Sequence, residues 1–141
     1  MINEKNLIDG IWTDGQDRLE VINPANGEVF ATVPKASAQD VEDAVNAADR
    51  AFAEWSRLTP FKRGELLRRA SLIVSERAED IARLMTREQG KPFAEALGEV
   101  RKGAEILRYY AEEGERIYGR IIPNAEPGIE SRVIYQPVGV A

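Results

Sequence analysis

Hydrophobic positions in the first part of the chain fall into short runs separated by turn residues. The two runs in residues 7–12 are divided by Asp9-Gly10, which predicts a strand, a turn and a second strand. Residues 20–22 and 29–33 flank the segment 23–27, which ends in Asn26-Gly27. Both residues of that pair tolerate positive φ, so it is a strong hairpin signal. We therefore expect a small antiparallel β flap before residue 37.

From residue 37 onward the apolar residues recur at helical spacing. Ser37 is a good N-cap, and Asp40 three residues later completes a capping box. One helical face then carries Val41, Val45, Ala48, Phe52 and Trp55. The pattern predicts a first helix that ends near Trp55.

Further helices are predicted between Thr59 and Gly119. Thr59-Pro60 supplies an N-cap and a proline at the first helical position, and the apolar stripe then runs, with a bend near Glu79, to Gly90. Gly90 suits a left-handed helix end and Pro92 suits a new helix start. The next helical pattern continues through Ile117 and stops at Gly119.

After Gly119 the pattern becomes strand-like again. Residues 121–123 and 131–136 are the expected strands, and a loop at 124–128 joins them. The last residues, 137–141, are apolar, whereas a chain end usually frays into polar residues at the surface. We expect the sequence to stop at the beginning of a buried strand.

Composition and charge narrow the classes of function. The chain has 141 residues, of which 43% are hydrophobic and 30% charged, as in an ordinary globular domain. Its net charge of −5 gives no reason to expect a nucleic acid or a membrane as partner. It has neither a span of about 20 apolar residues nor a signal peptide, so we expect a cytoplasmic protein.

Two residue types with catalytic chemistry are missing altogether. The chain contains no Cys and no His, so it has no thiolate nucleophile and lacks the usual general base near neutral pH. Catalysis by this chain alone would have to use carboxylates, Lys, Tyr or hydroxyl groups. Self-contained catalysis is therefore not expected, and no catalytic or cofactor-binding residue is assigned.

Several separated motifs carry a family resemblance. The most specific is Glu88-Gln89-Gly90-Lys91-Pro92 followed by Glu95 and Glu99. Others are the segments 9–12, 23–28, 47–55, 63–69 and 136–140. Together they resemble the N-terminal part of the aldehyde dehydrogenase superfamily, closest to the NAD(P)-dependent succinate-semialdehyde dehydrogenases.

The resemblance implies an α/β fold, the N-terminal part of an aldehyde dehydrogenase-like fold. Residues 1–118 would be the N-terminal part of the cofactor-binding domain, with the β flap and a helical array. Residues 119–137 would be a β excursion into the oligomerisation domain. Residues 138–141 would be the truncated start of the first Rossmann-like strand.

The resemblance also implies a reaction, whose chemistry lies outside this sequence. In such enzymes a Cys thiolate attacks the aldehyde, an Asn and a backbone N–H stabilise the oxyanion, and a Glu activates the hydrolytic water. NAD or NADP accepts the hydride in the full-length enzyme. The implied partners are the aldehyde, the remainder of the chain and further copies in a homodimer or homotetramer. The alternative is a non-catalytic assembly module that docks through residues 119–137.

One binding site is implied by the resemblance. Many relatives hold a monovalent cation with backbone carbonyls before the Asn-Pro and an acidic residue before the Gly-Lys. The matching positions are Val21, Ile22 and Glu88, and a hard cation suits oxygen ligands. The structural alternative is that Glu88 only accepts hydrogen bonds near a helix end.

Other conspicuous residues have structural interpretations. We expect Lys91 to interact with a helix C-terminus rather than a phosphate, and Glu95 and Glu99 to face solvent or pair with Arg101, Lys102 or Arg108. Ion pairs are expected for the basic cluster on the second helix, which consists of Arg63, Arg68 and Arg69. Of the adjacent Tyr109 and Tyr110, one is expected to point inward. Both tryptophans, Trp12 and Trp55, should be packing anchors.

Overall fold

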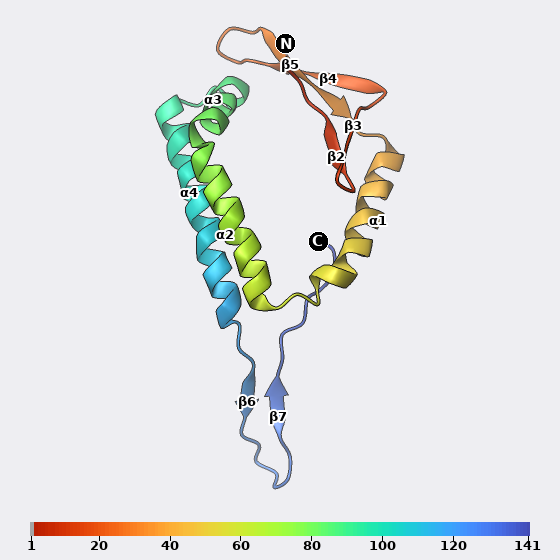
Figure 1. The fold of residues 1–141 in the computed structure, drawn as a ribbon, viewed down its shortest axis with the longest axis vertical. Coiled ribbons are helices and arrows are strands. Elements are labelled where there is room, and N and C mark those ends of the chain that lie inside the picture. The colour runs from red at the N-terminus through yellow and green to blue at the C-terminus, as the bar shows by residue number, and fades with distance from the viewer. Residues whose placement is uncertain (1) are drawn as a thin grey trace.

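Hairpins open the chain, as predicted. The structure is a computed structural model that describes residues 2–141 (Figure 1). In it β2 pairs with β3, and β5 lies between β1 and β4. The left-handed φ values of Asp9 (52°) and Gly10 (76°) form the first turn, and that of Gly27 (72°) the second. The strands are β1 Ile2–Asn3, β2 Asn6–Ile8, β3 Ile11–Thr13, β4 Asp17–Ile22 and β5 Val29–Lys35.

One strand pairing was not predicted. The backbone of β1 runs parallel to β5, with Ile2 opposite Ala31. The turn signals of a sequence announce only pairings between neighbouring segments, so this long-range pairing gives no local signal.

Four helices follow: α1 Ala38–Trp55, α2 Pro60–Glu76, α3 Ala78–Gln89 and α4 Phe93–Glu113. The predicted caps are confirmed. The Asp40 N–H donates to the Ser37 hydroxyl (3.1 Å), and the Ser37 N–H donates to the Asp40 carboxylate (2.7 Å). Thr59 caps α2, with Pro60 in its first turn. Gly90 ends α3 with a φ of 73°.

Two helix boundaries differ from the prediction. The break between α2 and α3 lies at Arg77 (φ −98°, ψ 12°), and Glu79 belongs to the first turn of α3. The Arg77 N–H donates a hydrogen bond to the Ile73 carbonyl of α2, and the Arg77 carbonyl accepts one from the Ile81 N–H of α3. Arg77 therefore joins the hydrogen-bonded backbones of the two helices. The last predicted helix ends earlier than expected: α4 gives way to a 3₁₀ turn, η1 Gly114–Arg116. Such a tightened last turn is common at helix ends.

The core lies between α2, α3 and α4 and consists largely of small residues. Ala82 and Ala96 are fully buried, beside Ala78 and Val100. Between α2 and α4 the Ser71 hydroxyl donates a 2.7 Å hydrogen bond to the Ala104 carbonyl. Small side chains let helix backbones approach closely, so these three helices form the tightly packed unit of the described chain.

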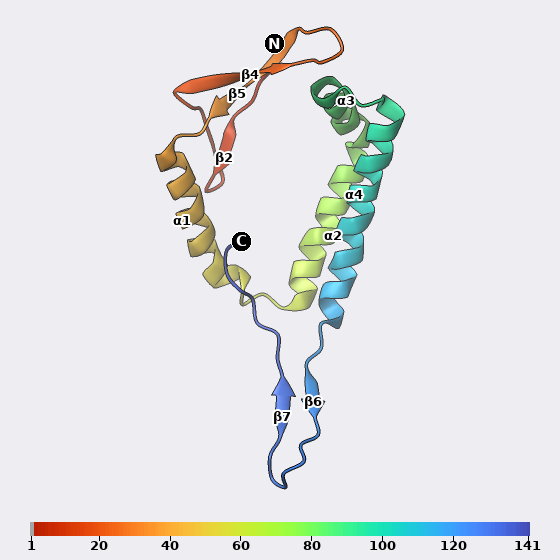
Figure 2. The same cartoon turned by 180° about the vertical axis from the view of Figure 1, so that it is seen from behind.

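The remaining elements surround an open frame. Figure 1 shows α1 standing apart from the three-helix unit, with the β1–β5–β4 sheet across the top. A two-stranded hairpin, β6 Arg120–Ile122 and β7 Ser131–Val133, extends away from the helices in both views (Figure 2). Within the described residues, 138–141 carry no assigned strand. The division into domains at residues 118 and 137 stays a prediction.

Much apolar surface is exposed. The accessible surface is 11,026 Å², whereas a compact protein of 15.7 kDa would expose about 7,300 Å². Trp12 is 63% and Trp55 44% exposed, so the prediction that they anchor the packing was wrong for this structure. Tyr109 and Tyr110 are also both exposed, in an edge-to-face pair, so neither points inward.

None of the helices in residues 2–141 is both long and apolar enough to cross a membrane.

Candidate functional site

The end of α3 lies against the loop between β4 and β5. A Cβ atom added to Gly90 would be 2.9 Å from the Cγ of Pro24. Next to this contact, the Arg87 guanidinium lies 4.3 Å from the centre of the Phe30 ring, a cation–π distance. The helix end that carries Glu88 is therefore held close to the strand end that carries Val21 and Ile22.

The three residues predicted to bind a cation lie on the two sides of this contact. Val21 lies opposite Ala31 in the β4–β5 ladder and Ile22 opposite Val29, with a bulge between them. A bulge leaves the extra residue of the bulged strand unpaired, and here that residue is Phe30 of β5, whereas Val21 and Ile22 of β4 each have a strand partner. Glu88 is exposed in the last turn of α3. Within residues 2–141, no cluster of three or more Asp, Glu, His or Cys side chains could hold a metal ion.

The other charged residues after α3 form a structural pair. Lys91 makes an ion pair with Glu99 of α4, so the partner of Glu99 is none of the expected Arg101, Lys102 and Arg108. The Glu99 side chain is also 54% exposed, in line with the other expectation, that it faces solvent. This pair links the loop after Gly90 to α4. Since both side chains are partly exposed to water, its contribution to stability is small.

The basic cluster on α2 is divided by the structure. Arg68 pairs with Glu115 at 3.0 Å, as predicted for the cluster, and joins α2 to η1. Arg63 instead donates a hydrogen bond to the Leu58 carbonyl. Within the described part of the chain, no carboxylate lies at ion-pair distance from Arg63. The two arginines therefore have different environments although they lie on one helix.

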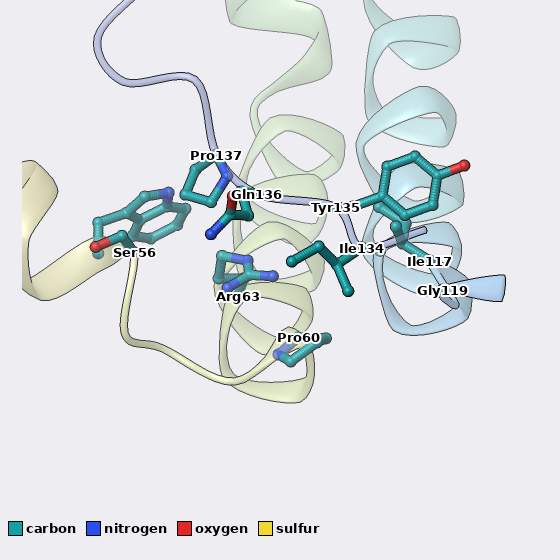
Figure 3. A pocket seen from close by; sticks show the side chains of 11 residues that line it. Ser56, Pro60, Arg63, Ile117, Gly119, Ile134, Tyr135, Gln136 and Pro137 are labelled. Atoms are coloured by element: carbon teal, nitrogen blue, oxygen red, sulfur yellow. The ribbon is translucent and has the colours of Figure 1, made fainter. Parts of the chain in front are cut away.

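Arg63 faces an open pocket of about 610 Å³, here named the Arg63 pocket. The pocket lies where the end of α1, the start of α2, the η1 region and the segment 134–137 meet. In Figure 3 the Gln136 side chain points toward that of Arg63. The lining residues are Trp55, Ser56, Pro60, Arg63, Gly114, Ile117, Gly119, Ile134, Tyr135, Gln136 and Pro137.

Neither the α3 contact nor the Arg63 pocket contains the Cys thiolate that the resemblance implies for the reaction, because the chain has no Cys. The pocket lining offers an arginine, a tyrosine, a serine and an amide, and the chain has no Cys or His. The pKa of the Asp40 carboxyl lies below its usual value of 3.8, mainly because the backbone N–H of Ser37 donates a hydrogen bond to it. This carboxylate belongs to the cap of α1 and not to either location.

Sequence reasoning singled out Arg63 only as a member of a basic cluster. It missed the pocket, because nothing in a local pattern shows that residues 134–137 pass beside α2.

Comparison with known proteins then identifies the class. Residues 12–141 match the aldehyde dehydrogenase family. The chain belongs to the aldehyde dehydrogenase family, and the expected fold is confirmed.

Individual relatives show how much of such an enzyme the chain represents. It is 42% identical to the NADP⁺-dependent succinate-semialdehyde dehydrogenase of Escherichia coli, over 99% of this chain and 30% of the relative. A glutarate-semialdehyde dehydrogenase of Pseudomonas putida is 43% identical with the same coverage. The crystal structure of a Staphylococcus aureus betaine aldehyde dehydrogenase with NAD⁺ superposes with a TM-score of 0.90 and 31% identity, over 97% of this chain and 28% of that one. The chain thus spans about 30% of the length of these curated relatives.

Proposed function

We propose that this chain is the N-terminal scaffold segment of an NAD(P)-dependent aldehyde dehydrogenase that oxidises an aldehyde to a carboxylate. The observation that carries the proposal is the alignment with the Escherichia coli enzyme, which includes 99% of this chain and only 30% of the relative. The scaffold holds the helices and strands against which the cofactor and catalytic parts of the enzyme fold.

The exposed surface supports this role. The accessible surface of the described chain is about 1.5 times that expected for a compact protein of its mass. On α1 the residues Val41, Val45 and Trp55 are exposed, and on α2 so are Phe61, Leu66 and Leu72. Apolar faces of this extent need a cover in a stable protein. The remaining parts of a dehydrogenase would supply it.

The substrate is proposed from the relatives. Enzymes named for succinate semialdehyde and glutarate semialdehyde are more than 40% identical to this chain. We assign a semialdehyde with a second, anionic end as the substrate class. NAD or NADP would accept the hydride, and the nucleophilic Cys, the oxyanion donor and the water-activating Glu would come from residues outside this chain.

A monovalent cation is proposed at the contact between α3 and the β4–β5 loop. The carbonyls of Val21 and Ile22 and the carboxylate of Glu88 would be its ligands. The contact between Gly90 and Pro24, which lie two residues from Glu88 and from Ile22, supports this proposal, and oxygen atoms suit such a cation.

The β6–β7 hairpin is proposed as the element that joins subunits into a homodimer or homotetramer. It has two strands of three residues each, so both of its edges are open to pairing. Ile121 on it is 72% exposed. The same observation supports the alternative function, a non-catalytic assembly module that docks through this hairpin.

Activity of the isolated chain tests the scaffold role. The purified 141 residues are incubated with succinate semialdehyde and either NAD⁺ or NADP⁺, and formation of reduced cofactor is followed by absorbance. The Escherichia coli relative is the positive control. We expect no reduced cofactor from the chain, because it has no thiol. Aldehyde-dependent NAD(P)H formation would show that the chain contains its own active site.

A further inference from the structure

We propose that Asn26 is a deamidation site that the folded β4–β5 loop keeps nearly unreactive. Asn26 is the one asparagine of the sequence that is followed by glycine. A glycine has no side chain to hinder attack by its own backbone nitrogen, so asparagine deamidates most readily in this dipeptide. The site is independent of the proposed dehydrogenase function, because the loop and water carry out the whole reaction.

The modification proceeds through a cyclic succinimide. The backbone nitrogen of Gly27 loses its proton and forms a bond to the Cγ atom of Asn26. The bond between Cγ and Nδ2 of Asn26 breaks, and Nδ2 takes up the proton and leaves as ammonia. Water then opens the ring at either of its carbonyl groups, which leaves aspartate or isoaspartate at position 26.

The attacking nitrogen of Gly27 is held in a hydrogen bond. Its N–H donates to the Asn23 carbonyl at 2.8 Å, and the Asn23 N–H donates to the Glu28 carbonyl at 2.9 Å, which closes the loop. The Gly27 nitrogen must give up this bond before it can lose its proton and turn toward Asn26. Because opening a hydrogen bond costs free energy, the folded loop raises the barrier to attack.

The side-chain amide of Asn26 is held at both of its polar atoms. Its Oδ1 accepts a hydrogen bond from the Glu28 N–H (3.1 Å), and its Nδ2 donates one to the Glu28 carboxylate (2.8 Å). The amide cannot reorient without breaking these bonds. The negative charge of Glu28 also disfavours the anionic nitrogen that must form at Gly27.

These hydrogen bonds all lie within residues 23–28, so the protection does not require any other part of a longer enzyme. Asn26 and Gly27 are exposed in the described chain, so burial is not what slows the reaction. Once formed, an aspartate at position 26 would lack the Nδ2 donor and would place a second negative charge beside Glu28. The modified loop should therefore be less stable than the original one.

Peptide mapping measures the modification directly. Trypsin cleaves after Arg18 and Lys35, so Asn26 lies in the peptide 19–35, in which the other asparagine, Asn23, precedes proline. The chain is kept either folded in buffer or unfolded in guanidinium chloride at the same mildly alkaline pH. Mass spectrometry follows the converted fraction, and chromatography separates isoaspartate from aspartate. We expect conversion to be slower in the folded chain by about tenfold or more, since at least two hydrogen bonds must open.

Variants identify the protecting group. Glu28→Ala removes the carboxylate that holds Nδ2 and should speed deamidation of the folded chain on the order of fivefold. In guanidinium chloride the variant and the original chain should react equally. Glu20→Ala is the matched control, because it removes an exposed carboxylate of β4 that lies opposite Thr32 in the ladder. It should deamidate like the original chain.

Equal rates in the folded and the unfolded chain would overturn the protection by the loop. An Asn26 that stays unmodified in guanidinium chloride would overturn the site itself, and a folded Glu28→Ala variant no faster than the original would overturn the role of Glu28. If circular dichroism shows that Glu28→Ala does not fold, the comparison of folded and unfolded original chain decides the matter.

Discussion

Gly64 of α2 lies so close to Ala111 of α4 that a Cβ atom at Gly64 would be 2.7 Å from the Ala111 carbonyl oxygen. The obstacle is backbone, which cannot rotate away as a side chain can. Replacing Gly64 by Ala should therefore lower the free energy of unfolding by about 1–2 kcal/mol, even after the gain in helix propensity. Urea denaturation followed by circular dichroism measures this loss.

Gly98 provides the matched control, since it lies in α4 and a Cβ atom added there would have no neighbouring atom within 4 Å. Gly98→Ala should raise the free energy of unfolding by about 0.5–1 kcal/mol through helix propensity alone. A Gly64→Ala variant as stable as Gly98→Ala would show that the two helices are not packed at this distance.

Gly90 combines a left-handed φ of 73° with its contact on Pro24. Gly90→Ala should cost about 1–2 kcal/mol for the left-handed backbone alone, and more because of the clash with Pro24. Gly128 has a similar φ of 81° and no neighbour, so Gly128→Ala reports the backbone cost without the clash. Thermal melts should rank Gly90→Ala as the less stable variant. Adding Pro24→Ala should recover part of its loss, and strict additivity of the two substitutions would argue against the contact.

Asp40 should make the stability of α1 depend on pH below about 4. Its folded-state pKa lies below the usual 3.8, first because the Ser37 N–H bonds to its carboxylate. The stabilisation is therefore present above pH 3.8 and is lost as the pH falls through the folded-state pKa. Asp40→Asn should be less stable than the original chain at pH 7, and the difference should shrink by pH 3. A difference independent of pH would mean that the charge of Asp40 has no part in the cap.

Glu88 tests the proposed cation. If the site binds K⁺ with a Kd near 10 mM, replacing choline by about 100 mM K⁺ at constant ionic strength should stabilise the chain by about 1.4 kcal/mol. Glu88→Gln should remove the effect. Glu95→Gln, an exposed carboxylate on the neighbouring helix, should retain it. Equal melting temperatures in choline and K⁺ for the original chain would contradict the site.

The parts of the fold that sequence predicts are those with local causes. The two hairpins follow from Asp9-Gly10 and Asn26-Gly27, and the starts of α1 and α2 from Ser37 and Thr59-Pro60. Except for Asn26, which keeps a negative φ beside Gly27, the residues that favour the geometry also form it. Turn and cap residues of this kind can be recognised without knowing which distant segments pack against them.

The failures concern long-range relations. The pairing of β1 with β5, the ion pair of Lys91 with Glu99 and the Arg63 pocket all depend on segments brought together by folding. Trp12 and Trp55 were expected to be packing anchors, but a pattern of apolar residues does not say what covers them. Both are exposed in a chain that represents about 30% of the relatives' length.

A chimaera tests the central claim most directly. Residues 1–141 of this protein replace the aligned segment of the Escherichia coli succinate-semialdehyde dehydrogenase, with which they share 42% identity. The account predicts a folded enzyme that oxidises succinate semialdehyde with NADP⁺, because the grafted segment supplies scaffold and the recipient supplies the chemistry. The same recipient without the segment is the control and should be inactive. A chimaera that folds and binds NADP⁺ but shows no dehydrogenase activity would contradict the account.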